Sequence, residues 1–160
     1  MRDAMTAPLA LDALDRRLLQ AVQRQADLSH AALAEAVGTS PASCWRRLKA
    51  LEEAGVLGPA VRLLDPAALG LALDAVCQVR MKAHDAQARG SFEQFVLDRD
   101  EVLECLSMSG EWDYQLRIVV RDMAQYEHFL MHALLRHPAV ATSASHFALK
   151  RIKATTQLPV

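Results

Sequence analysis

This sequence of 160 residues contains no long apolar run, and its N-terminal stretch does not have the pattern of a signal peptide. No stretch of about 18 uninterrupted apolar residues occurs, which is the length that a membrane-spanning helix needs. The N-terminal stretch MRDAMTAPLALDALDRR also lacks the apolar core of a signal peptide, typically about 7 to 15 residues long. We therefore expect a cytoplasmic protein with no membrane contact.

Cysteine is scarce, and its positions indicate neither disulfides nor a metal site. Cys44, Cys77 and Cys105 are isolated from one another, with no C-x-x-C pair and no histidine at metal-ligand spacing. We expect them to be reduced and mostly buried. His128 and His132 have the i, i+4 spacing that can bind zinc, but without an H-E-x-x-H motif we interpret them as a solvated or interface pair.

Neither an excess of positive charge nor a catalytic signature is present. The formal net charge is -1, so any binding of nucleic acid has to come from a local basic cluster. No Gly-rich phosphate loop, catalytic-triad signature or metal motif occurs. We therefore expect no enzymatic activity and no cofactor, whereas a hydrophobic content of 52% is enough for a packed core.

The N-terminal part contains three segments with helical periodicity. The first covers residues 11–25, and the second follows Ser29, a favoured N-cap residue, and ends before Gly38. The third begins at Pro41 and continues as ASCWRRLKALEEA up to Gly55. Three helices with a tight glycine-containing turn before the last are typical of a helix-turn-helix, whose last helix enters the DNA major groove.

The third helix carries the candidate DNA contacts. Arg46, Arg47 and Lys49 lie within about one turn and can neutralise phosphates or pair with guanine. The alternative is a solvated basic face, which the position in a helix-turn-helix disfavours. Backbone N–H groups at the start of this helix attract anions, and Trp45 either packs on the DNA backbone or fills core space. The predicted set is Ser40, Ala42, Ser43, Trp45, Arg46, Arg47 and Lys49.

Beyond the third helix the apolar period changes from 3.6 towards 2. We interpret VLGPAVRLLD as a small two-stranded wing with Pro59 at an edge or turn, and DPAALGLAL as a turn with a short linker helix. Next come a strand at AVCQVRMK, a helix at SFEQFVLDRD and a hairpin around Gly110-Glu111. A helix opened by Asp122 and a strand at ATSASHFALKRIK follow. This order, β-α-β-β-α-β, predicts a ferredoxin-like domain in an α+β protein.

Three separated stretches together resemble the Lrp/AsnC, or feast/famine, family of bacterial and archaeal regulators. They are LDALDRRLLQAVQRQADLS, VGTSPASCWRRLKALEEAGVL with the LLDPAALG that follows it, and SGEWDYQLRIVVRDMAQY. The resemblance implies a sequence-specific transcriptional regulator that binds double-stranded DNA through a winged helix-turn-helix. It further implies a response to a small amino acid and control of genes for amino acid metabolism or transport. Gly58-Pro59-Ala60 departs from the basic or polar residue and Gly-Tyr usual in the family's wing, and Trp112 from the usual smaller or phenylalanine residue.

The resemblance also implies how copies assemble and where the effector binds. We expect residues 1–64 to bind DNA, 65–74 to be a linker, and 75–160 to sense the ligand and dimerise through the sheet, with dimers forming tetramers or octamers. In a cleft between dimers, Asp113 would receive the effector's ammonium, although the hairpin taken by itself is better interpreted as an ordinary β-turn. The residues carried over to this cleft are Leu106, Gly110, Asp113, Met123 and His146. An architectural DNA-binding protein without an effector is the alternative function.

Overall fold

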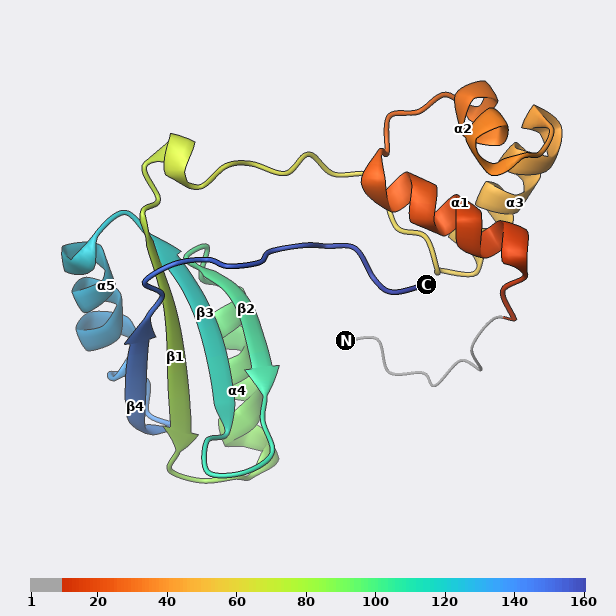
Figure 1. Ribbon diagram of the computed structural model, residues 1–160. Helices are drawn as coiled ribbons and strands as arrows, with labels where there is room; N and C mark the ends of the chain where they lie inside the picture. The colour runs from red at the N-terminus through yellow and green to blue at the C-terminus, as the bar shows by residue number, and fades with distance from the viewer. Residues whose placement is uncertain (1–9) are drawn as a thin grey trace. The chain divides into compact units, whose positions relative to one another are not determined.

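The computed structural model describes residues 10–160, which divide into two compact units (Figure 1). The first unit extends to Leu63 and includes residues 153–160, and the second spans Leu64–Ile152. Residues 153–160, which we expected in the second domain, group with the first because the Leu158 N–H donates to the Gln23 side-chain oxygen at 2.6 Å. The start of the predicted first domain, and with it part of the stretch searched for a signal peptide, lies outside the described residues.

Helix α1 (Ala13–Arg24) begins where two aspartates satisfy its free N–H groups. The Asp12 carboxylate accepts hydrogen bonds from the backbone N–H groups of Leu14 and Asp15, both at 2.8 Å. The Asp15 carboxylate accepts one from the Asp12 N–H at 3.2 Å, which completes a capping box. The predicted first helix is therefore confirmed, together with the local signal that starts it.

Helices α2 (His30–Val37) and α3 (Pro41–Glu53) start at serine N-caps and are joined by a tight turn. The turn needs Gly38, whose φ of 73° lies in the left-handed region that favours glycine. The three helices share one apolar core, made of Leu18, Leu33, Ala34, Val37, Cys44 and Leu48. The predicted helix-turn-helix is confirmed.

The two-stranded wing expected after α3 is not formed. Residues 56–65 contain no strand, and most of their side chains are exposed. Pro59 has no N–H group to donate to a strand ladder, which works against pairing in this segment. The expected linker helix is a single 3-10 turn, Ala67–Leu69, closed by Gly70.

In the described residues, the second unit contains one four-stranded antiparallel sheet with helices α4 (Ala86–Leu97) and α5 (Met123–Phe129) on one face (Figure 1). The strand order is β2-β3-β1-β4, so β1 and β3 are central. This is the predicted β-α-β-β-α-β arrangement. The strands are β1 (Leu73–Met81), β2 (Val102–Ser107), β3 (Tyr114–Val120) and β4 (Val140–Phe147).

Both helices of this unit differ in extent from the sequence-based expectation. Helix α4 begins well before SFEQFVLDRD, because the Asp85 carboxylate caps it by accepting from the Ala88 N–H at 2.9 Å. Helix α5 passes into a wider π-helical turn at Leu130–Leu134. That turn belongs to the wall of a cavity described below.

The core of the second unit lies between the sheet and its helices. Along β1, Cys77 and Val79 are fully buried, while Val76, Gln78 and Arg80, which alternate with them, are only partly buried. The Tyr126 hydroxyl donates to the Ser145 Oγ at 2.6 Å, and burial raises the pKa of this phenol. The three cysteines are free, with Cys105 partly buried and its pKa raised to about 11 by burial.

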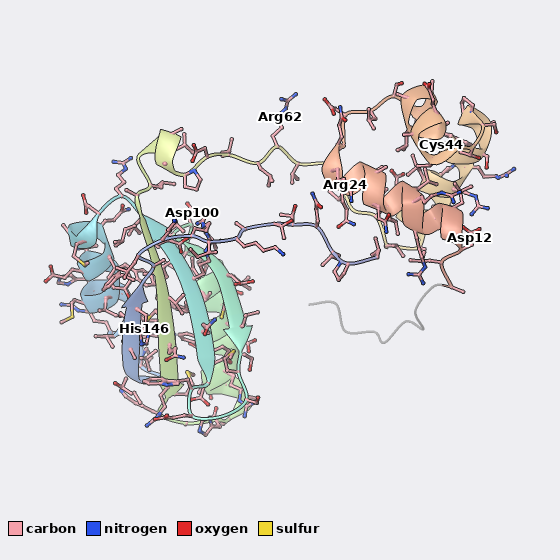
Figure 2. The ribbon with its side chains drawn as sticks, viewed as in Figure 1. Asp12, Arg24, Cys44, Arg62, Asp100 and His146 are labelled. Atoms are coloured by element: carbon pink, nitrogen blue, oxygen red, sulfur yellow. The ribbon has the colours of Figure 1, made fainter. Side chains whose placement is uncertain are left out.

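No helix formed by residues 10–160 covers the opposite face of the sheet (Figure 1). Here the Asp74 carboxylate accepts from the Arg117 guanidinium at 2.8 Å and also pairs with Arg151. The Arg117 hydrogen bonds are the main cause that lowers the pKa of Asp74. Val76 lies on this face opposite His146 of β4, which is labelled in Figure 2. Among the described residues, no helix is long and apolar enough to span a membrane.

Candidate functional site

Helix α3 presents one continuous exposed face. Ala42, Trp45, Arg46 and Lys49 follow the spacing i, i+3, i+4 and i+7, which places them side by side, and all four are exposed. The opposite stripe, which includes Cys44 (labelled in Figure 2), is buried in the core. We call these four residues the α3 face.

The chemistry of the α3 face combines an aromatic ring with two cations. Trp45 is 51% exposed, so its indole is available for contact and does not fill the core. The Lys49 ammonium lies 5.3 Å from the centre of the Trp45 ring, and 3.8 Å from the Glu53 carboxylate. Arg46 takes part in none of the ion pairs found among the described residues.

The N-terminal end of α3 borders this face. The Ser40 hydroxyl accepts from the Ser43 N–H at 3.3 Å and so acts as the helix cap. Pro41 occupies the first turn of the helix and has no N–H group. Ser40 and Ala42 are exposed and Ser43 is half-buried, so the predicted N-terminal contacts adjoin the α3 face.

Arg47 corrects the sequence-based set, because its side chain makes a fold contact and lies outside the α3 face. Its Nη1 donates to the Asp12 carboxylate at 2.6 Å and to the Asp15 carboxylate at 2.7 Å. The pair joins α3 to the capping box of α1. The pKa of Asp12 is lowered first by the Asp15 N–H and then by Arg47. No local motif marks this role, since the partners lie more than thirty positions earlier in the chain.

The β2–β3 hairpin holds two of the predicted effector residues. Gly110 has a φ of 119°, a conformation that favours glycine. Asp113 does not present a free carboxylate, since its Oδ2 accepts from the Met81 N–H at 2.7 Å and its Oδ1 lies 3.3 Å from His84 Nδ1. Because a carboxylate can accept about four hydrogen bonds, it keeps capacity for a ligand.

The five predicted effector residues are not brought together within one chain. Gly110 and Asp113 precede β3, whereas Met123 follows it at the start of α5. Leu106 lies on β2 at one edge of the sheet, and His146 lies on β4 at the other edge. A cleft that contains all five has to draw them from more than one copy of the chain.

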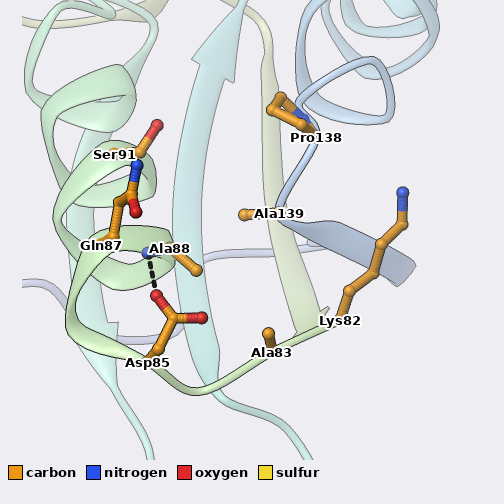
Figure 3. A pocket seen from close by; sticks show the side chains of 8 residues that line it. All are labelled: Lys82, Ala83, Asp85, Gln87, Ala88, Ser91, Pro138 and Ala139. Carbon is orange, nitrogen blue, oxygen red and sulfur yellow. Dashed lines mark hydrogen bonds between the residues drawn. The ribbon is translucent and has the colours of Figure 1, made fainter.

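Two cavities lie near the hairpin end of β1. One of about 120 Å³ is lined by Asp113 together with His84, Arg89 and Met108, of which only Asp113 was predicted. The other, of about 300 Å³, lies between the N-terminal end of α4 and the turn into β4 (Figure 3). None of the predicted effector residues lines it. Sequence reasoning missed the first group because its members come from separate loops and strands without a shared motif.

Ser91 lines the second cavity, and its contact with His137 does not have the arrangement of a nucleophile and its base. The Ser91 Oγ lies 3.4 Å from His137 Nε2, but His137 Nδ1 accepts from the Ala139 N–H at 3.3 Å. A neutral ring that accepts at Nδ1 carries its proton on Nε2 and donates to the serine. General-base activation of the serine needs the opposite arrangement.

Comparison with family models accounts for both units. The model of the Lrp/AsnC ligand binding domain matches residues 74–158, and a model of winged helix-turn-helix DNA-binding domains matches residues 11–57. The first of these covers more than half of the chain. The chain belongs to the Lrp/AsnC family. The second match ends at residue 57, before the segment in which no wing strands form.

Relatives in the Lrp/AsnC family match over nearly the whole chain. The DNA-binding transcriptional activator DecR of Escherichia coli K12 is 40% identical over 94% of this chain and 99% of its own length. The leucine-responsive regulatory protein of Haemophilus influenzae is 33% identical over 93% of this chain and 90% of its own. A crystal structure of a Neisseria meningitidis regulator in complex with L-methionine superposes with a TM-score of 0.90 at 40% identity, covering 93% of this chain and 96% of that one.

Membership in the Lrp/AsnC family confirms the expected fold class and the coarse function. The protein is a DNA-binding transcriptional regulator with a ligand-binding domain, and it is not an enzyme. The helix-turn-helix, the β-α-β-β-α-β order of elements and the family were thus predicted correctly, while the strands expected around Pro59 do not form and the ion pairs of Arg47 were not predicted.

We expect Arg47→Ala to lower the stability of the first unit more than Arg46→Ala, because only Arg47 joins α3 to α1. Because the pKa of Asp12 is lowered in the folded protein, its ionised carboxylate contributes stability at pH values above the ordinary pKa of 3.8. That stability is lost as the pH falls through the pKa of the folded state. The difference between the variants should therefore be full at pH 7 and shrink below about pH 4. Urea unfolding, followed by Trp45 fluorescence in a Trp112→Phe background, measures this difference in stability. Equal unfolding midpoints at pH 7 would remove Arg47 from this role.

Proposed function

We propose that this Lrp/AsnC regulator reads its operator through the α3 face and the adjoining helix start, and that it responds to a small amino acid. Genes of amino acid metabolism or transport are the proposed targets. The observation that carries the DNA-binding half is the exposed Trp45, Arg46 and Lys49 side chains on one face of the third helix. The Neisseria meningitidis relative, solved with L-methionine, supports the effector half.

The α3 face suits the major groove because each side chain has a distinct partner there. Arg46 can pair with guanine or neutralise a phosphate, and Lys49 can neutralise a second phosphate. The free N–H groups at the helix start attract a backbone phosphate, with Ser40, Ala42 and Ser43 close to it. Trp45 packs its ring against the sugar-phosphate backbone.

We propose that copies of the chain associate through the open face of the sheet. That face has no covering helix, and Val76 of central strand β1 lies on it with its side chain partly buried. In a two-fold dimer the same sheet face of each copy would meet its counterpart on the other copy. Further association of dimers into tetramers or octamers would create clefts between the dimers. The wide separation of the five effector residues within one chain supports a cleft built from several copies.

In such a cleft the hairpin holds the backbone end of the amino acid. The remaining acceptor sites of Asp113 bind the ammonium, and hairpin N–H groups near Gly110 bind the carboxylate. Leu106, Met123 and His146 form the walls. The architectural alternative lacks this cleft ligand, and it is distinguished by thermal unfolding, since a ligand that binds only the folded state raises the midpoint.

Arg46→Ala should weaken binding to the DNA upstream of the chain's own gene by about tenfold or more and reduce the salt slope of log affinity by about one unit per lost phosphate contact. The reason is the loss of a cation with no other ion-pair role. Arg136→Ala, which removes an exposed arginine of the second unit, is the matched control. Fluorescence anisotropy over a salt series measures both quantities. Unchanged affinity and slope for Arg46→Ala would rule out α3 as the reader.

Val76→Glu should reduce the mass of the particle in solution, because an unpaired carboxylate would be buried when two sheet faces meet. Leu97→Glu is the control, since Leu97 lies on α4 and is 79% exposed. Light scattering during size-exclusion chromatography gives the mass of each. The same mass for both variants and the wild type would contradict association through this face.

Asp113→Asn should lower amino acid affinity by about 10- to 100-fold, which corresponds to the roughly 1.5–3 kcal/mol of a hydrogen bond to a charged group. An asparagine oxygen still accepts from the Met81 N–H, so the hairpin stays anchored. Asp113→Ala, in contrast, would lose this hydrogen bond as well as the contact with the ligand's ammonium. Glu111→Gln, which neutralises the carboxylate that pairs with Arg80, is the control. Calorimetry measures the affinities. Normal binding by Asp113→Asn excludes this carboxylate, and no response of the wild type to any amino acid favours the architectural alternative.

A further inference from the structure

A cavity of about 350 Å³ lies at the end of β3 opposite to the hairpin. Arg99 and Glu101 enter its wall from the connection between α4 and β2, and Gln125, His128 and His132 enter from α5 and the π-helical turn. The strand spans seven residues, so roughly 20 Å separates this cavity from the hairpin. Its volume is in the range of small-molecule sites.

The Arg99 side chain in this wall has a buried nitrogen without a hydrogen-bond partner among the described residues. Its Nε is buried and has no hydrogen-bond partner among the described residues, and none of the ion pairs found there includes its guanidinium. The guanidinium carbon lies 4.7 Å from the centre of the Phe95 ring, which holds the group in place. Buried polar groups without a partner are rare in proteins, and a charged one is costly to leave without an acceptor.

The neighbouring polar side chains complete a set of donors. The Gln125 Oε1 accepts from the Arg121 N–H at 2.9 Å, so the amide is oriented and its NH₂ group remains available. The rings of His128 and His132 stack with their centres 4.9 Å apart. Val120 and Phe129 supply apolar wall between these groups.

Glu101 decides which anion fits. A carboxylate in the same wall as Arg99 opposes a multiply charged anion such as phosphate, but it provides a partner for a cation. A molecule with a carboxylate at one position and an ammonium beside it satisfies both residues. The backbone oxygen of Glu101 accepts from the Val119 N–H at 2.9 Å, which fixes the turn that carries it.

We propose that this cavity binds an α-amino acid by its zwitterionic end, as a second amino acid site that one chain forms by itself. The Arg99 guanidinium binds the carboxylate through paired N–H donors, and Glu101 binds the ammonium. Gln125 and the two histidines contact the amino acid's side chain. The site goes beyond the proposed function, because it needs neither the hairpin nor a contact between copies.

Titration calorimetry of the full chain with each of the twenty amino acids tests the site. At least one should bind the wild type, keep a binding site in Asp113→Asn, and lose at least tenfold in affinity in Arg99→Met, which retains an unbranched stem against Phe95. Arg136→Met is the control for loss of an arginine outside the cavity. Glu101→Gln should weaken the amino acid but leave its amino-free carboxylate analogue unaffected.

Four outcomes would overturn the proposal. In the first, the amino acid binds Arg99→Met as tightly as the wild type and no longer binds Asp113→Asn. That result would show binding at the hairpin and none in this cavity. Equal weakening of the amino acid and its amino-free analogue by Glu101→Gln contradicts the zwitterion, as does the absence of any binding by the wild type. If Arg99→Met does not fold, the exposed pair His128→Ala and His132→Ala replaces it, and unchanged affinity in that double variant also overturns the proposal.

Discussion

The burial of Cys44 and Leu48 in the three-helix core is the constraint on which the proposed DNA-binding surface depends. A helix that packs through this stripe has a single rotational setting, and the residues between the stripe positions must then face outward. Trp45, Arg46 and Lys49 are exposed for that reason. The ion pairs of Arg47 with the two aspartates of the capping box also hold α3 against α1. They lie at the edge of the three-helix core, where they are only partly shielded from water. The proposed recognition of DNA thus depends on an apolar stripe that is itself buried in the core.

The second unit follows the same logic with a period of two. The helices cover the sheet face that holds Cys77 and Val79, and the other face is the one proposed to associate with a second copy. The two ends of β3 have different chemistry. At the hairpin end, Asp113 is already engaged with a backbone N–H, while at the far end Arg99 has an unsatisfied buried nitrogen. A regulator with two such places has two separate ways to couple ligand binding to its state, each limited by how differently the ligand binds the two states.

Local signals made most of the fold predictable from the sequence. Ser29 and Gly38 mark helix ends through hydrogen bonds within a few residues, and Pro41 marks a helix start because its position there needs no N–H group. The alternation along β1 reports which face is buried. The residues of the α3 face were all in the predicted set, but the contact that Arg47 makes with α1 was not predictable, since its partners are distant in sequence. The two strands expected in the segment around Pro59 do not form, because its apolar residues do not ensure that a strand ladder pairs. The Asp113 bond to Met81 and the cavity around Arg99 depend on strand register and on turns, which composition and spacing do not report.

Hydroxyl-radical footprinting of the two tryptophans, with and without the DNA upstream of the chain's own gene, tests the central claim most directly. Trp45 is exposed on the α3 face and Trp112 lies in the hairpin, so one protein carries both the probe and its internal reference. The account predicts that DNA slows oxidation of the Trp45 indole severalfold while the rate at Trp112 stays the same. Equal oxidation of Trp45 in free and DNA-bound protein would contradict recognition through α3.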